Sequence, residues 1–144
     1  MKSYFFTVSG KPEGKRRPRF SRKTGTAYNP QENIAYENRI ENAFRVQYPT
    51  ENPTDKPVSL NVIAVYPIPK SWAKKKQIAA HEGEIFPSRP DWDNIGKIVC
   101  DALNGVAFHD DAQIYNAFVR KQYGLFPELR VLIEITDGEE KKTA

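Results

Sequence analysis

The sequence is poor in the residues that build disulfides and zinc sites. Its 144 residues include one cysteine, Cys100, and two histidines, His81 and His109. A single cysteine has no partner within the chain, so internal disulfides are excluded, which fits a reducing compartment. The scarcity of thiols and imidazoles also argues against a zinc site built from them. We therefore expect a cytoplasmic protein without a cysteine-rich metal site.

Long apolar runs are also missing. No stretch reaches the roughly 20 apolar residues that span a bilayer, and the N-terminus lacks the apolar core of a signal peptide. We expect no membrane association. Apolar residues still make up 39% of the chain, which is enough for one core. We expect a single domain over residues 1–136 and a polar, frayed tail over residues 137–144.

Hydrophobic periodicity predicts both strands and helices. The predicted strands are residues 2–9, 58–66, 112–123 and 128–136, and the predicted helices are residues 31–48, 72–81 and 91–103. Together they indicate an α/β (α+β) fold in which helices pack on a mixed sheet of about four strands. The first helix has Ile34, Ile40, Ala43, Phe44 and Tyr48 on its apolar face. Ser71 is the expected cap of the second.

The helix predicted for residues 91–103 has two distinct faces. At about 100° per residue, its apolar side chains fall within roughly 140° of arc. They are Ile95, Ile98, Val99, Ala102 and Leu103. Asp93, Lys97 and Asp101 fall within about 80° on the opposite side. The helix should therefore bury one face and expose a line of charged side chains.

Residues 91–111 hold five aspartates, and four of them form two close groups. Asp91 and Asp93 are two residues apart, and Asp110 is next to Asp111. Such like charges repel unless a cation or hydrogen-bond donors compensate them. Magnesium is suited to carboxylates and phosphate oxygens, so a metal site for phosphodiester hydrolysis is one interpretation. The other is a helix N-cap with surface ion pairs, including an Asp93–Lys97 pair.

Residues 11–23 form a basic segment, with seven Lys or Arg residues against one Glu. Its prolines and glycines oppose regular structure, so we predict a loop. It is either a solvated run of charge or a surface for nucleic acid. Phe20 and Tyr28 favour nucleic acid, because aromatic rings stack on bases while the cations contact phosphates. Both interpretations also apply to the three lysines at residues 74–76.

Three blocks of sequence, with the basic segment before them, resemble the RusA family of Holliday junction resolvases. The blocks are Pro90-Asp91-Trp92-Asp93-Asn94-Ile95-Gly96-Lys97, Asp101-Ala102-Leu103-Asn104-Gly105 and Asp110-Asp111-Ala112-Gln113-Ile114, preceded by Arg16-Arg17-Pro18-Arg19 and Tyr28. The resemblance runs from about Tyr4 to Thr136. It implies a small homodimeric endonuclease, of a kind often carried by phages and prophages, that acts in DNA recombination and repair. Such enzymes use magnesium, which Mn²⁺ can replace, and cut four-way DNA junctions by paired symmetric nicks. The resemblance also implies an α/β fold with helices on a mixed sheet.

The resemblance also assigns roles to residues. It implies metal binding by Asp91, Asp93, Asp110 and Asp111, with Asp111 favoured over its neighbour. It implies a catalytic set of Asp91, Asp93, Lys97 and Asp111, in which Lys97 contacts the phosphate. The residues expected to hold the DNA backbone are Arg16, Arg17, Arg19, Arg22, Lys23 and Lys97. Asn94 would orient a ligand, and Asp101 would cap or pair.

Two other functions remain open at this level. One is a protein that binds branched DNA without cutting it. The other is a metal-dependent enzyme acting on a nucleotide or nucleotide-sugar, although a small substrate needs no extended basic surface. Phe86 and Trp92 flank the acidic stretch. They either pack within the protein or stack on and wedge apart bases at the crossover.

Overall fold

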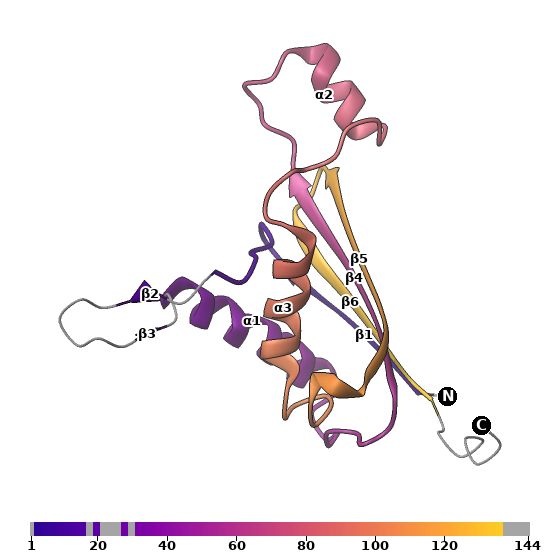
Figure 1. Cartoon of the computed structure of the whole chain (residues 1–144). Helices are drawn as coiled ribbons and strands as arrows, with labels where there is room; N and C mark the ends of the chain where they lie inside the picture. Colours follow the sequence, from indigo (N-terminus) through magenta and orange to yellow (C-terminus); the bar gives the residue numbers. More distant parts are fainter. Residues whose placement is uncertain (1, 17–18, 21–26, 29–30, 137–144) are drawn as a thin grey trace.

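Four strands form a mixed sheet in the order β1–β6–β4–β5 (Figure 1). They are β1 (Lys2–Ser9), β4 (Val58–Pro67), β5 (Ile114–Gly124) and β6 (Glu128–Ile135). β6 runs antiparallel to both β1 and β4, whereas β4 and β5 are parallel. The computed structural model describes residues 2–16, 19–20, 27–28 and 31–136. The single mixed α/β domain predicted from the sequence is confirmed.

Two helices cover one face of this sheet: α1 (Gln31–Gln47) and α3 (Trp92–Leu103). Figure 1 shows both on the same side of the strands, and the two helices contact each other. Alternate residues of β6 are buried beneath them, as the alternation of its sequence predicts. β4 is paired on both sides and buried along most of its length, in line with its continuous apolar run.

The buried face of α1 differs from the predicted one. Ile40 and Phe44 are buried as expected, but Ile34 is 42% exposed and the prediction for it is wrong. Asn33 and Tyr36 are buried in its place. Asn33 can be buried because its side-chain amide is hydrogen-bonded to the preceding segment, which satisfies its polar atoms.

Helix α2 (Lys74–His81) projects beyond the ends of strands β4 and β5 (Figure 1). It begins two residues later than predicted, with Ala73 rather than Ser71 at its N-cap position. Trp72 packs edge-on against Tyr123 of β5, with ring centroids 5.4 Å apart. The aromatic contact joins this projection to the sheet, and Lys76 lies over the Trp72 ring.

One short strand lies within the predicted basic loop, and its partner strand follows the loop. β2 (Arg19–Phe20) pairs antiparallel with β3 (Ala27–Tyr28). A ladder of two residues on each side is too short to show a periodicity, so the sequence pattern could not reveal it. Strand β5 follows a one-turn 3-10 helix, η1 (Asp111–Gln113), and so begins two residues later than predicted. Residues 137–144 lie outside the described part of the chain, and the domain boundary at residue 136 stays a prediction.

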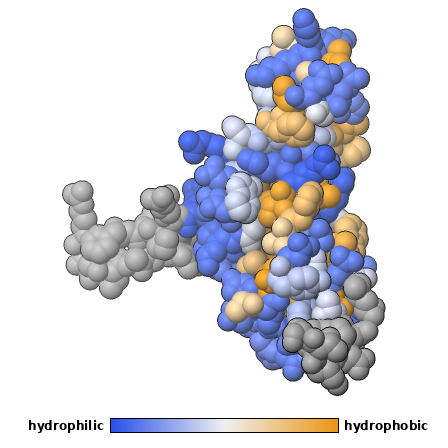
Figure 2. Space-filling model, turned by 45° about the vertical axis from the view of Figure 1, so that its right-hand side comes forward, coloured by the Kyte–Doolittle hydropathy of each residue, from blue (hydrophilic) through white to orange (hydrophobic). Residues whose placement is uncertain are grey.

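The second face of the sheet carries exposed apolar side chains. Phe5, Leu132, Asn61 and Phe118 are paired in one row across the four strands. Phe5 is 49% exposed and Phe118 is 48% exposed, whereas their chain neighbours Phe6 and Val119 face the core. Figure 2 shows apolar surface on the body of the molecule between hydrophilic regions. Among the described helices, none is long and apolar enough to cross a membrane.

Candidate active site

The two faces of α3 lie as its sequence predicts. All five residues of its apolar face are buried, and the remaining face carries Asp93, Lys97 and Asp101. The helix ends at Leu103, and Gly105 follows with a φ of 77°, a conformation that favours glycine. Burial of the apolar face therefore fixes which way the charged side chains point.

Asp91 occupies the N-cap position of α3, but its carboxylate makes no capping hydrogen bond. The backbone carbonyl of Asp91 accepts from the N–H groups of Asn94 and Ile95, at 3.1 and 3.2 Å. In the first turn, Asp93 Oδ1 accepts the Asn94 N–H at 3.0 Å. Both carboxylates are exposed. The capping interpretation is therefore wrong for the Asp91 side chain.

Asp110 and Asp111 lie at the start of η1, after the loop that follows α3. The pKa of Asp111 is raised above its ordinary value, first by a hydrogen bond with Asp110, then by burial and by the negative charge of Asp110. Lys97 lowers this pKa and Asp101 raises it, so Asp111 is within electrostatic reach of the polar face of α3. The tertiary structure thus brings Asp111 towards Lys97.

Gln113 holds this acidic turn in place. Its Oε1 accepts the backbone N–H groups of His109 and Asp110, both at 2.9 Å. Its Nε2 donates to the carbonyl oxygens of Thr54 and Lys56, also at 2.9 Å. One amide side chain thus ties the loop carrying Asp110 and Asp111 to the linker before β4.

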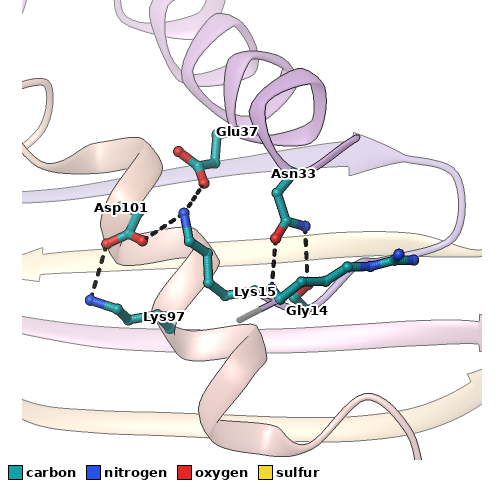
Figure 3. A network of polar contacts seen from close by, with 7 residues as sticks. Gly14, Lys15, Asn33, Glu37, Lys97 and Asp101 are labelled. Atoms are coloured by element: carbon teal, nitrogen blue, oxygen red, sulfur yellow. Dashed lines mark hydrogen bonds and ion pairs between the residues drawn. The ribbon is translucent and has the colours of Figure 1, made fainter. Parts of the chain in front are cut away.

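A network of charged side chains supports the polar face of α3 (Figure 3). Lys15 Nζ lies 2.6 Å from Glu37 Oε2 on α1 and 3.1 Å from Asp101 Oδ2 on α3. Burial alone lowers the pKa of Lys15, but hydrogen bonds to both carboxylates raise it, and the net pKa is above the ordinary value. The Lys15 ammonium is therefore engaged in ion pairs that link α1 and α3.

Lys97 joins the same network through Asp101. Its Nζ lies 3.4 Å from Asp101 Oδ1, the oxygen that Lys15 does not contact. Among the described residues, the Asp93–Lys97 ion pair of the capping interpretation is not formed. Asp101 pairs with Lys97 instead, which is one of the two roles expected of it. The Lys97 side chain stays 58% exposed, so its ammonium is held on one side and accessible on the other.

The segment that supplies Lys15 is fixed between the two helices. Asn33 Oδ1 accepts the backbone N–H of Arg16 at 2.6 Å, and Asn33 Nδ2 donates to the carbonyl of Gly14 at 3.2 Å. The Lys15 N–H donates to the Asn94 carbonyl oxygen at 2.8 Å. A residue of α1 and a residue of α3 therefore hold this segment against the acidic end of the site.

The predicted metal ligands do not converge on one point. Within the described residues, no group of three or more His, Cys, Asp or Glu side chains is close enough to hold a metal ion. The donor chemistry nevertheless suits magnesium, which takes one or two carboxylates and keeps waters and phosphate oxygens as its other ligands. Asp91 and Asp93 are exposed at one end of α3, and Asp111 approaches its polar face from the loop beyond its other end.

The structure describes only part of the predicted DNA-binding set. Arg16 is exposed and lines a groove beside Asp91, and Arg19 lies in β2. The predictions for Arg17, Arg22 and Lys23 fall outside the described residues. Phe86 is 54% exposed and Trp92 is 64% exposed, so the interpretation that their side chains pack within the protein is wrong for both.

Sequence reasoning missed three residues that position the site. Asn33 and Glu37 belong to a helix read only for its apolar face, and Gln113 was part of a motif without an assigned role. Apart from the contacts of Gln113 with His109 and Asp110, their partners lie 17 to 59 residues away in the chain. The one available signal was that Asn33 falls on the same helical face as Tyr36 and Ile40.

Comparison with known proteins adds an independent observation. The model of the family described as endodeoxyribonuclease RusA matches residues 9–136. An uncharacterized protein of Bacillus subtilis (strain 168), YqaN, is 35% identical over 133 residues, which cover 89% of this chain and 93% of that protein. The family match includes all the acidic residues of the site, Lys97 and the Lys15–Asp101 network. The chain belongs to the RusA family of endodeoxyribonucleases.

Proposed function

We propose that this protein cuts four-way DNA junctions by metal-dependent hydrolysis of phosphodiester bonds. The observation that carries the proposal is the exposed polar face of α3, where Asp93 and Lys97 lie one turn apart and Asp111 is within electrostatic reach. The family supports an endodeoxyribonuclease acting on Holliday junctions. The metal, the paired nicks and a role in recombination and repair are the further parts of the proposal.

Each residue has a distinct part in the proposed reaction. Asp91 and Asp93, together with Asp111 and its neighbour Asp110, would supply the carboxylates for a magnesium ion, for which Mn²⁺ could substitute. The two groups lie apart in this structure, so the proposal requires them to move together when the ion binds. When bound, such an ion lowers the pKa of a water molecule and stabilises negative charge on the phosphate. Lys97 would contact the scissile phosphate, where a fixed positive charge stabilises the developing charge. Asp101, whose Oδ1 lies 3.4 Å from Lys97 Nζ, would hold that ammonium on the exposed polar face of α3.

We also propose a homodimer in the cytoplasm. A four-way junction has near two-fold symmetry, so a symmetric dimer could present two sites to opposite strands. The single cysteine supports a reducing compartment. The exposed row containing Phe5 and Phe118 is the surface that we expect a second copy to bury.

The test is cleavage of a labelled synthetic four-way junction with and without magnesium. We expect wild type to cut only with the metal, and Asp93→Asn and Lys97→Ala to lose about 100-fold or more of the rate. Lys75→Ala, on the exposed surface of α2, serves as the matched lysine control. No cutting by wild type with magnesium or manganese would refute the nuclease, leaving a protein that only binds branched DNA. Cutting by Asp93→Asn at the wild-type rate would refute the site.

A further inference from the structure

A groove of about 700 Å³ lies directly beside the proposed metal site. Residues 11–16 form one side, and residues 89–91 with Asn94 of α3 form the other. The lining residues are Lys11, Pro12, Glu13, Gly14, Lys15, Arg16, Arg89, Pro90, Asp91 and Asn94. Asp91 belongs to both the groove and the acidic site, so a ligand lying in the groove would lead into that site.

The groove is built from backbone that other residues hold in place. A Cβ atom on Gly14 would lie 2.6 Å from the Pro90 Cβ, so the two sides approach as closely as glycine allows. The hydrogen bonds of Asn33 to Gly14 and Arg16 fix one side, and the Lys15–Asn94 bond ties it to the other. The groove is therefore pre-formed, which reduces the entropy that a ligand must overcome.

The exposed charges of the groove suit a phosphodiester backbone. Lys11, Arg16 and Arg89 are exposed and line it, whereas the Lys15 ammonium is turned towards Glu37 and Asp101. Guanidinium groups match phosphate oxygens in two-point contacts, and an ammonium adds a point charge. The carboxylates of the groove, Glu13 and Asp91, are fewer than these three cations.

We propose that this groove binds the sugar-phosphate backbone of the strand to be cut, on one side of the scissile phosphate, through Lys11 and Arg89 together with Arg16. The proposal rests on the proposed function and adds the path by which the strand enters the site. Contacts of this kind position the DNA and carry no sequence information. Loss of a groove cation should therefore weaken binding to junctions of different sequence by the same factor.

The test compares Lys11→Gln/Arg89→Gln with the control pair Lys70→Gln/Arg45→Gln, which removes one lysine and one arginine from exposed positions outside the groove. Binding of a labelled four-way junction is measured by fluorescence anisotropy in EDTA, from about 50 to 200 mM salt. Each lost phosphate contact reduces the slope of log K against log salt by roughly 0.7–0.9. We expect the groove pair to reduce it by roughly 1.4–1.8 and the control pair to leave it unchanged.

Two results would overturn the proposal that this groove binds the DNA backbone. One is a groove pair that keeps the wild-type slope, and the other is a control pair that lowers the slope as much as the groove pair does. Both mutated groove residues are exposed, so thermal melting should show folded variants. Failure of the proposed function would give a different result from failure of the groove proposal. Wild type would then bind the junction with the expected salt slope but leave it uncut in magnesium.

Discussion

Replacing Lys15 by methionine tests the network behind Lys97. The substitution keeps most of the side-chain volume but removes the ammonium that lies 2.6 Å from Glu37 and 3.1 Å from Asp101. Two carboxylates, each only 21% exposed, then lose their shared cation. Breaking a fully buried pair costs about 3–5 kcal/mol. Because this site is partly exposed, we expect a loss of about 2–3 kcal/mol in the free energy of unfolding.

Thermal and urea denaturation followed by circular dichroism measure this loss. In a chain of this size, about 2–3 kcal/mol corresponds to a Tm lowered by roughly 5–10 °C. Lys75→Met, at an exposed position on α2, is the matched control and should change stability by less than about 0.5 kcal/mol. Adding Glu37→Gln and Asp101→Asn to Lys15→Met should recover much of the loss, because no partly buried carboxylate is then left without a cation. Lys97 loses its partner Asp101 in this variant, but its side chain is 58% exposed.

The contribution of Lys15 to the free energy of unfolding should be lost at high pH. Because the pKa of Lys15 is raised on folding, its contribution is complete below its unfolded pKa of about 10.4 and disappears as pH rises through the folded pKa. The stability difference between wild type and Lys15→Met should thus be constant near neutral pH and shrink above about pH 10.5.

The rate of junction cleavage by Lys15→Met should also fall, by about tenfold, because Asp101 loses one of the contacts that orient it. A variant as stable and active as wild type would refute the network.

Four further predictions follow from other contacts. Gln113→Ala removes four hydrogen bonds, so we expect a loss of about 2–4 kcal/mol by urea denaturation and slower cutting; wild-type stability would contradict this. Gly14→Val places side-chain atoms against Pro90 and should cost about 1–3 kcal/mol, whereas Gly83→Val, which has open space at Cβ, reports backbone strain alone. Magnesium at about 100-fold its Kd should stabilise wild type by about 2.7 kcal/mol and Asp93→Asn by less, measured by thermal shift; equal shifts would exclude Asp93 as a ligand. Phe118→Glu should lower the mass measured by light scattering from dimer to monomer, and an unchanged mass would place the interface elsewhere.

The strands, the helix over residues 91–103 and its two faces could be predicted from sequence because they depend on local periodicity. The side chains of a strand alternate and those of a helix recur every 3.6 residues, so apolar spacing identifies the face that the core buries. This is why Asp93 and Lys97 emerge on one side of the helix, while the opposite side buries the predicted residues Ile95, Ile98, Val99, Ala102 and Leu103. The two-residue strands β2 and β3 show the limit, because they are shorter than any repeating pattern.

Side-chain roles that depend on distant partners needed the tertiary structure. Asn33 is buried and Ile34 exposed because the 14–16 segment supplies partners for the amide. Lys15, one of several bases in the basic segment, differs from Lys11 only because Glu37 and Asp101 surround it. The order of residues alone determined that this chain has an acidic stretch at residues 91–111 and a basic segment at residues 11–23. Which of these charges are paired within the protein and which stay exposed to solvent was decided by contacts between segments far apart in the chain.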